Sequence, residues 1–201
     1  MPRPAKFTDE EVLDAALSCV SDDGAGVTMA DVAARLGGPV GSIYHRFASR
    51  DELLARLWIR TVRDFQAGLF ALAETYEGDP ERILVDSALH VPRYCREHPD
   101  RARALSLFRQ PVLLASAPEG VRDDVASLND GIDRLARRLT RAHYGSASAA
   151  HVELVLLATR IAPYGLVRPY VGAPVPPVID QATRASAEAI LSLEPSGRRR
   201  R

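Results

Sequence analysis

The stretch TMADVAARLGGPVGSIYHRFASRDELL, residues 28–54, decides the fold of this chain. Thr28 can cap a short helix, with Asp31 three residues later as the acidic partner of the cap. That helix ends at the run GGP at residues 37–39. Its proline suits the first turn of a new helix, because the missing N–H would be unpaired there in any case. Two short helices joined by a turn that contains glycine predict a helix-turn-helix.

The second helix of this motif is predicted over residues 40–47. Ile43 and Phe47 are four residues apart, so both are expected to face the interior. Val32 and Leu36 supply the inward side chains of the preceding helix. This packing fixes the angle at which the second helix projects, so that its outward residues can enter a DNA major groove.

The charge around the motif favours nucleic acid, although the formal net charge of the chain is zero. No acidic residue occurs between residues 32 and 49, whereas several basic residues lie in or beside that stretch. A protein that reads DNA needs local positive potential rather than a basic chain as a whole. The basic residues are Arg35, His45, Arg46 and Arg50.

The motif offers DNA two kinds of contact. Small residues permit close approach of the backbone, and side-chain donors can reach phosphates or base edges. The helix starts at Thr28 and Ser49 present free N–H groups that favour phosphate, although both residues are helix caps with or without DNA. Gly41 also suits tight helix packing. The small residues are Gly41 and Ser42, and the donors are Tyr44, His45 and Arg46.

These residues resemble the N-terminal domain of the TetR family of regulators. The likeness covers roughly residues 8–58 and rests on TMADVAARLG, GSIYHRF and SRDELL, which begin at residues 28, 41 and 49. It departs from the family pattern at the pair Gly38-Pro39, at Arg46 and at Arg50, which leaves the base preference open. The resemblance implies a double-stranded DNA operator, contacted by Thr28, Val40, Gly41, Ser42, Tyr44, His45 and Arg50.

The rest of the chain is expected to be helical, since no alternating strand pattern occurs. A first helix follows the cap pair Thr8 and Glu11, and a long fourth helix runs from Ser49 to about Tyr76. Further helices are expected over residues 81–97, 98–108, 119–143, 149–166 and 179–193, with a loop at 111–118. The predicted class is all-α, with an N-terminal three-helix helix-turn-helix domain linked by a long helix to a C-terminal helical domain.

The predicted domain organisation has three segments. Residues 1–50 form the DNA-binding domain, residues 51–194 the ligand-binding and dimerisation domain, and residues 195–201 a basic tail that is expected to be disordered. The resemblance implies a homodimer, for which the apolar residues 152–166 and the last helix are the candidates. Candidate pocket residues, each of which also suits an ordinary core, are Trp58, Phe70, Tyr94, Phe108 and Tyr164.

Composition and spacing argue against several other classes of protein. Cys19 and Cys95 lie far apart within helical patterns, which argues against a disulfide framework. The five histidines show no metal-ligand spacing, and no phosphate-binding glycine loop or nucleophile elbow occurs. No enzyme activity, catalytic residue, metal or cofactor is therefore expected. No apolar run approaches the roughly 18 residues of a membrane span, and no signal peptide is recognised. A cytoplasmic protein with no membrane partner is expected.

The predicted function is a ligand-responsive, DNA-binding transcriptional regulator. Repression, relieved by an unknown small-molecule effector, is the favoured direction, and activation stays open. The alternative is a helical ligand-binding or scaffold protein that keeps the motif but has lost DNA binding. The intact set of Tyr44, His45, Arg46 and Arg50 favours the regulator.

Overall fold

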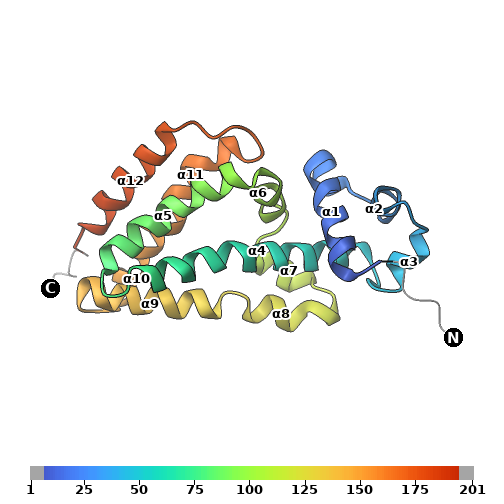
Figure 1. The fold of residues 1–201 in the computed structure, drawn as a ribbon. Coiled ribbons are helices and arrows are strands. Elements are labelled where there is room, and N and C mark those ends of the chain that lie inside the picture. Colours follow the sequence, from blue (N-terminus) through green and yellow to red (C-terminus); the bar gives the residue numbers. More distant parts are fainter. Residues whose placement is uncertain (1–6, 195–201) are drawn as a thin grey trace. The chain divides into compact units, whose positions relative to one another are not determined.

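The computed structural model describes residues 7–194, and every regular element in that range is a helix or a helical turn. Figure 1 shows these elements along the chain. The predicted all-α class is confirmed for the described residues. The predicted basic tail at 195–201 lies outside them.

The N-terminal elements begin and end where local signals place them. Thr8 and Thr28 each form a complete capping box, with Glu11 and Asp31 as the acidic partners. Gly37 ends the second helix in the left-handed conformation, with a φ of 64°, which a residue without a Cβ adopts without strain. The elements are α1 (Asp9–Asp23), a short 3-10 turn η1 (Gly24–Gly26), α2 (Met29–Leu36), α3 (Val40–Tyr44) and α4 (Arg50–Thr75).

The remaining elements are shorter and more numerous than the sequence patterns predict. The expected loop at 111–118 contains a helix, and the expected helix at 119–143 is broken by a turn before Asp130. The side chain of Asn129, at this break, accepts a hydrogen bond from Gln66 at 3.0 Å and does not cap the next helix. The helices are α5 (Pro80–Glu97), α6 (Pro99–Leu105), α7 (Gln110–Ser116), α8 (Arg122–Ser127), α9 (Asp130–Tyr144), α10 (Ala149–Leu156), α11 (Ala162–Val167) and α12 (Val178–Leu191).

The apolar segment from Ala149 to Tyr170 is one continuous helical stretch. Its α10 and α11 are joined by a π turn, η3 (Leu157–Ile161), and it ends in a 3-10 turn, η4 (Arg168–Tyr170). Pro163 has no N–H to donate to the carbonyl four residues earlier, which accounts for the wider turn before it. The stretch is long and apolar enough to cross a membrane, with a mean hydropathy of 1.2 over 18 residues. The expectation of no such run was therefore wrong.

This one helix is weak evidence for a membrane span. The core helix of a soluble protein passes the same test of length and composition. Only 22% of its apolar window is buried within the chain. The stretch therefore offers an apolar surface that the described part of the chain does not cover.

The chain forms two compact units. Unit 1 comprises residues 1–64 and 98–128, of which the structure describes 7–64 and 98–128. Unit 2 comprises residues 65–97 and 129–201, described to residue 194. Helix α4 begins at residue 50, where the predicted domain boundary falls, and contributes to both units.

The apolar cores of the described residues lie within the units, two in unit 1 and one in unit 2. The first core of unit 1 joins α1, α2, α3 and the start of α4, and it includes the fully buried Ala104 of α6. A second core of the same unit packs Trp58 and Ile59 of α4 against Leu113 and Val125. Unit 2 packs α5 and α9 against residues of the α10–α11 stretch and α12. The sequence-distant α6 thus completes the core that supports the helix-turn-helix.

Both cysteines are buried thiols. Cys19 belongs to the first core of unit 1, and Cys95 lies on α5 in unit 2. Burial raises the pKa of the Cys95 thiol to about 11, so this thiol stays protonated at neutral pH. Neither cysteine forms a disulfide.

Candidate nucleic-acid interface

Helix α3 stands on two buried anchors, as the sequence predicts. Ile43 is fully buried, and Phe47 is 1% exposed. The helix is shorter than expected and ends at Tyr44, and the following residues form a tight turn in which the N–H of Arg46 and that of Phe47 both donate to the carbonyl of Ile43 at 2.9 Å. This turn brings Phe47 into the core although it lies outside the helix.

The outward face of α3 is largely uncharged. Tyr44 is 52% exposed, and Val40, Gly41 and His45 are exposed beside it. A Cβ added at Gly41 would meet nothing within 4 Å, so no packing within the protein requires glycine there. Ser42 is half-buried, and its hydroxyl donates to the carbonyl of Pro39 at 2.7 Å.

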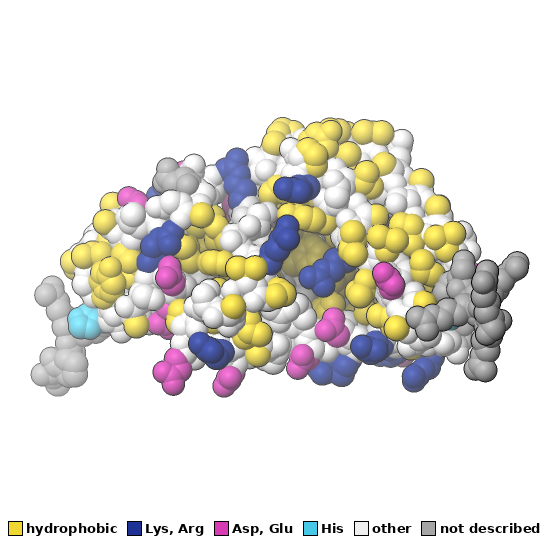
Figure 2. Space-filling model, turned by 180° about the vertical axis from the view of Figure 1, so that it is seen from behind, with side chains coloured by type: hydrophobic (Ala, Val, Ile, Leu, Met, Phe, Trp, Pro, Cys, Tyr) yellow, Lys and Arg dark blue, Asp and Glu magenta, His cyan; other side chains and the backbone are white. Residues whose placement is uncertain are grey.

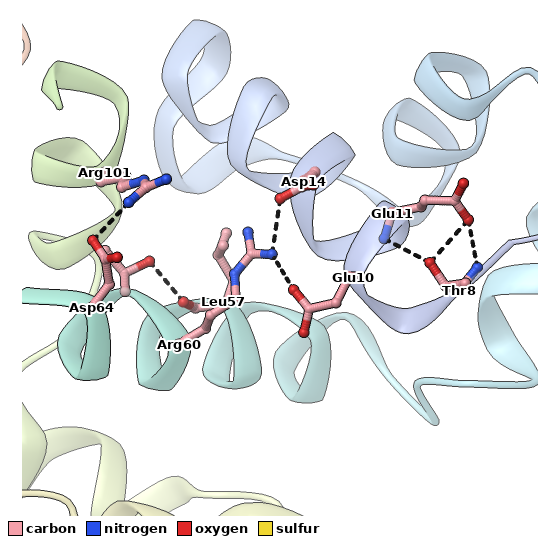
Figure 3. A network of polar contacts seen from close by, with 9 residues as sticks. Thr8, Glu10, Glu11, Asp14, Leu57, Arg60, Asp64 and Arg101 are labelled. Atoms are coloured by element: carbon pink, nitrogen blue, oxygen red, sulfur yellow. Dashed lines mark hydrogen bonds and ion pairs between the residues drawn. The ribbon is translucent and has the colours of Figure 1, made fainter. Parts of the chain in front are cut away.

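The two capping boxes hold the N-termini of α1 and α2. The N–H of Thr28 donates to Asp31 at 2.8 Å, and the N–H of Asp31 donates to the Thr28 hydroxyl at 3.2 Å. Thr8 and Glu11 repeat this arrangement at 2.7 and 3.2 Å, as Figure 3 shows. The backbone N–H of Thr8 lowers the pKa of Glu11, and the side chain of Thr28 lowers that of Asp31.

These lowered pKa values predict acid sensitivity of the caps. In the unfolded chain both carboxyls titrate at their ordinary values of 4.5 and 3.8, so their stabilising contribution is complete above that range. It is lost as the pH falls through the lower folded pKa values. Thermal unfolding should therefore show the variants Glu11→Gln and Asp31→Asn below wild type at pH 6, with the difference shrinking at pH 3. A constant difference would contradict the assignment.

Two arginines predicted to contact DNA, Arg46 and Arg50, bind partners within the protein. The guanidinium of Arg50 donates to the carbonyl of Val27 at 2.5 Å and also to that of Ala25, both in the connection between α1 and α2. Arg46 pairs with Asp9 of α1. Sequence reasoning missed these partners because they lie 23 to 37 residues away.

Two further predicted residues of this region have intramolecular partners. The hydroxyl of Ser49 accepts the N–H of Glu52 at 3.1 Å and so caps α4, as expected. Arg35 pairs with Asp22 at 2.7 Å and also donates to Ser18. The arginines near α3 therefore connect α1, α2 and α4 to one another or to the α1–α2 connection.

A second set of arginines joins α1, α4 and α6 in unit 1, as Figure 3 shows in part. Arg60 of α4 reaches Glu10 at 2.8 Å and Asp14 at 2.9 Å, both on α1. Arg101 of α6 pairs with Asp64 of α4 at 2.8 Å. Arg103 of α6 donates to the carbonyl of Ser21 at the end of α1. No local sequence signal marks these pairs, because each depends on the tertiary arrangement.

The predicted pocket residues are distributed over both units. Trp58 and Phe108 contact each other edge to face in unit 1, with centroids 6.3 Å apart, and the Trp58 N–H donates to the carbonyl of Leu105 at 3.2 Å. In unit 2, Phe70 lies close to Gly131, Tyr94 packs against Phe65, and Tyr164 is exposed.

Two cavities of the described residues are lined by other side chains. One, of about 280 Å³, lies in unit 1 beside Arg56, Arg60 and Arg63. The other, of about 610 Å³, lies in unit 2 between α5 and α12. No group of three or more His, Cys, Asp or Glu residues within the described range could hold a metal ion.

The N-terminal region matches a known protein family. Residues 12–57 match the sequence model of the family described as bacterial regulatory proteins, tetR family. This range covers α2 and α3 and ends within α4. The search of curated proteins finds no match.

Solved structures share the fold over almost the whole chain. A transcriptional regulator from Rhodococcus sp. Rha1 is 20% identical, with a TM-score of 0.70 over 94% of this chain and 100% of that one. The ketosteroid transcriptional regulator KstR2 of Mycobacterium tuberculosis is 17% identical, with a TM-score of 0.68 over 92% and 94%. SmeT, the repressor of a Stenotrophomonas maltophilia multidrug efflux pump, is 17% identical, with a TM-score of 0.67 over 94% and 91%. The sequence match identifies residues 12–57 as a region of the tetR family of bacterial regulatory proteins, and the solved structures show that the fold of the whole chain is shared with such regulators.

Proposed function

We propose that the chain is a ligand-responsive repressor that binds a double-stranded DNA operator as a homodimer. The observation that carries the proposal is the exposed face of α3, which stands on the buried Ile43 and Phe47 and displays Tyr44 and His45 around an unobstructed Gly41. Small residues with flanking donors suit close approach to base edges in a major groove. The N-termini of α2 and α4 can bind backbone phosphates beside it.

The apolar C-terminal surface supports the homodimer. Figure 2 shows hydrophobic side chains gathered over the C-terminal helices of unit 2. The large exposed members are Ile161, Tyr164, Val178 and Leu193. Monomeric soluble proteins rarely leave extended apolar patches open to water. A second copy of the same surface would cover it with a two-fold, four-helix interface.

The proposed response to ligand acts on the spacing of the two recognition helices. A dimer on DNA holds its α3 helices about one helical turn apart, roughly 34–36 Å. Because α4 is one helix of 26 residues that contributes to both units, an effector that displaces it would change that spacing. Such coupling between sites is typically about 1–3 kcal/mol. The names of KstR2 and SmeT connect those proteins with ketosteroids and with an efflux pump, and no effector follows from them for this chain.

The test of DNA binding uses DNA that flanks the protein's own gene. Fluorescence anisotropy at several salt concentrations should show saturable binding that weakens with salt, since released counterions drive association. Gly41→Leu should fold normally, because the site is open, but should bind that DNA far more weakly. Absence of binding at low salt would favour the alternative of a helical ligand-binding or scaffold protein.

The role of Arg50 can be separated from a direct phosphate contact. We expect Arg50→Gln to weaken operator binding at every salt concentration, because the α1–α2 connection ahead of Thr28 loses two hydrogen bonds. The slope of log K against log salt should stay unchanged, whereas loss of a phosphate contact would reduce it by about 1. His45→Gln is the matched control for a residue on the exposed face, where loss of a direct contact with DNA is expected. A reduced slope for Arg50→Gln would instead indicate that Arg50 contacts a phosphate directly, as the family resemblance implies.

A further inference from the structure

A groove lined by three arginines and four acidic residues crosses unit 2 between α5 and α12, which lie side by side in Figure 1. Its volume is about 610 Å³. The side chain of Asp86 lies in it, 13% exposed, and three guanidinium groups surround this one carboxylate. Arg82 and Arg93 come from α5 and Arg184 from α12. We call this set the Asp86 cluster.

The guanidinium groups of the Asp86 cluster approach the carboxylate without hydrogen-bonding to it. Each nearest nitrogen is 3.9 Å from an Asp86 oxygen, well beyond the roughly 2.7–3.2 Å of an N–H···O hydrogen bond. The same two helices do form a close pair elsewhere, since Arg96 donates twice to Asp180, at 2.8 and 3.1 Å. The loose geometry is therefore particular to the cluster and leaves its N–H donors available to a ligand.

The acidic residues around the groove do not each form an ion pair with one arginine of the cluster. Glu188 lies 3.6 Å from Arg184, so two carboxylates face three guanidinium groups within 4 Å. Asp79 and Glu81 also line the groove. Asp79 accepts the backbone N–H of Arg82 at 3.1 Å as a cap of α5, and Glu81 is exposed in the first turn of that helix. Neither forms an ion pair with a described arginine.

One member of the cluster is held in place by a ring. The guanidinium of Arg82 lies over Tyr76, 3.9 Å from the ring centroid. This contact orients the positive group without using its in-plane donors. Arg93 and Arg184, about half exposed, approach from the two helices. The arrangement presents planar donors from both sides of an open groove.

We propose that the Asp86 cluster is a binding site for a small, multiply charged oxyanion, carried as a phosphate or as paired carboxylates. Guanidinium forks match the oxygens of both groups. The bound anion would take the donors of Arg93 and Arg184, and the Asp86 carboxylate competes with it for the same cations. Binding would connect α5 to α12 through the ligand, independently of any contact with DNA.

Isothermal titration of the full chain at constant ionic strength tests the site, with inorganic phosphate and citrate as separate probes. We expect saturable binding of at least one probe, and the preferred probe tells which oxyanion chemistry the groove takes. Arg93→Gln and Arg184→Gln should each weaken it about 10-fold or more. Arg137→Gln, at an exposed position of α9, is the matched control and should bind as wild type. Equal affinities in all three variants, or no saturation with either probe, would overturn the proposal.

A variant with the opposite expected sign separates this site from a purely structural salt-bridge cluster. Asp86→Asn removes the competing carboxylate and keeps its shape, so the anion should bind several-fold more tightly and raise the midpoint of thermal unfolding by more than in wild type. A structural cluster would show lower stability in Asp86→Asn with no gain in anion binding, and that result would sink the proposal. Because both measurements use protein without DNA, their failure leaves the operator-binding proposal untouched.

Discussion

Replacing Phe47 with alanine should remove a large share of the stability of unit 1 and thereby weaken operator binding. Phe47 is 1% exposed and packs in the core that joins α1, α2, α3 and α4. Truncating a buried phenylalanine to alanine costs about 3–5 kcal/mol, a large share of the roughly 5–15 kcal/mol of a typical domain. Urea unfolding followed by circular dichroism would measure the loss.

The matched control for Phe47 lies two residues away. His45 is exposed, so His45→Ala should leave the free energy of unfolding within about 0.5 kcal/mol of wild type. It should nevertheless lower operator affinity, which separates recognition from folding. Phe47→Leu keeps much of the buried volume and should retain both folding and DNA binding. A Phe47→Ala protein as stable as wild type would show that this side chain does not anchor α3.

The second large effect is expected at the apolar surface of unit 2. Ile161 is 58% exposed, so Ile161→Glu should cost the single chain little stability. In the proposed dimer the same carboxylate would be buried without a partner, which should weaken dimerisation about 100-fold or more. Analytical ultracentrifugation should then show monomers, and operator binding should fall with the loss of the paired α3 helices.

The control for Ile161 is an equally exposed apolar residue in the other unit. Val112 on α7 is 63% exposed, and Val112→Glu should leave both the sedimentation of the protein and its operator affinity unchanged. If Ile161→Glu still sedimented as wild type, the interface would have to lie elsewhere. If wild-type protein were itself monomeric at micromolar concentration, the homodimer proposal would fail.

The features predicted well from the sequence depend on local chemistry. The caps at Thr8 and Thr28 need only a hydroxyl and a carboxylate three residues apart, and the structure forms both boxes. The burial of Ile43 and Phe47 was also predicted, although Phe47 enters the core through the turn after α3 and not through helical spacing. Such signals lie within a few residues of one another, so the fold class and the recognition helix could be read directly.

The features that the sequence did not reveal depend on distant partners. The guanidinium of Arg50 could bind a phosphate or a carbonyl with equal chemical ease, and only the tertiary fold places Ala25 and Val27 beside it. The Asp86 cluster likewise needs Arg184, which is 98 positions away along the chain. Helix α7 was hidden by prolines at both ends of a short segment, which also suit a loop.

The place of Ala104 in the core of unit 1 bears on how such a protein can be divided. This residue comes from α6, yet it lies fully buried in the core shared by α1, α2, α3 and α4. An excised fragment ending at residue 64 would therefore lack Ala104 and leave a cavity in its core. Chimeras that exchange the DNA-reading half between relatives would need to carry residues 98–128 along with it. Recombination at the end of α3 alone would separate residues that fold together.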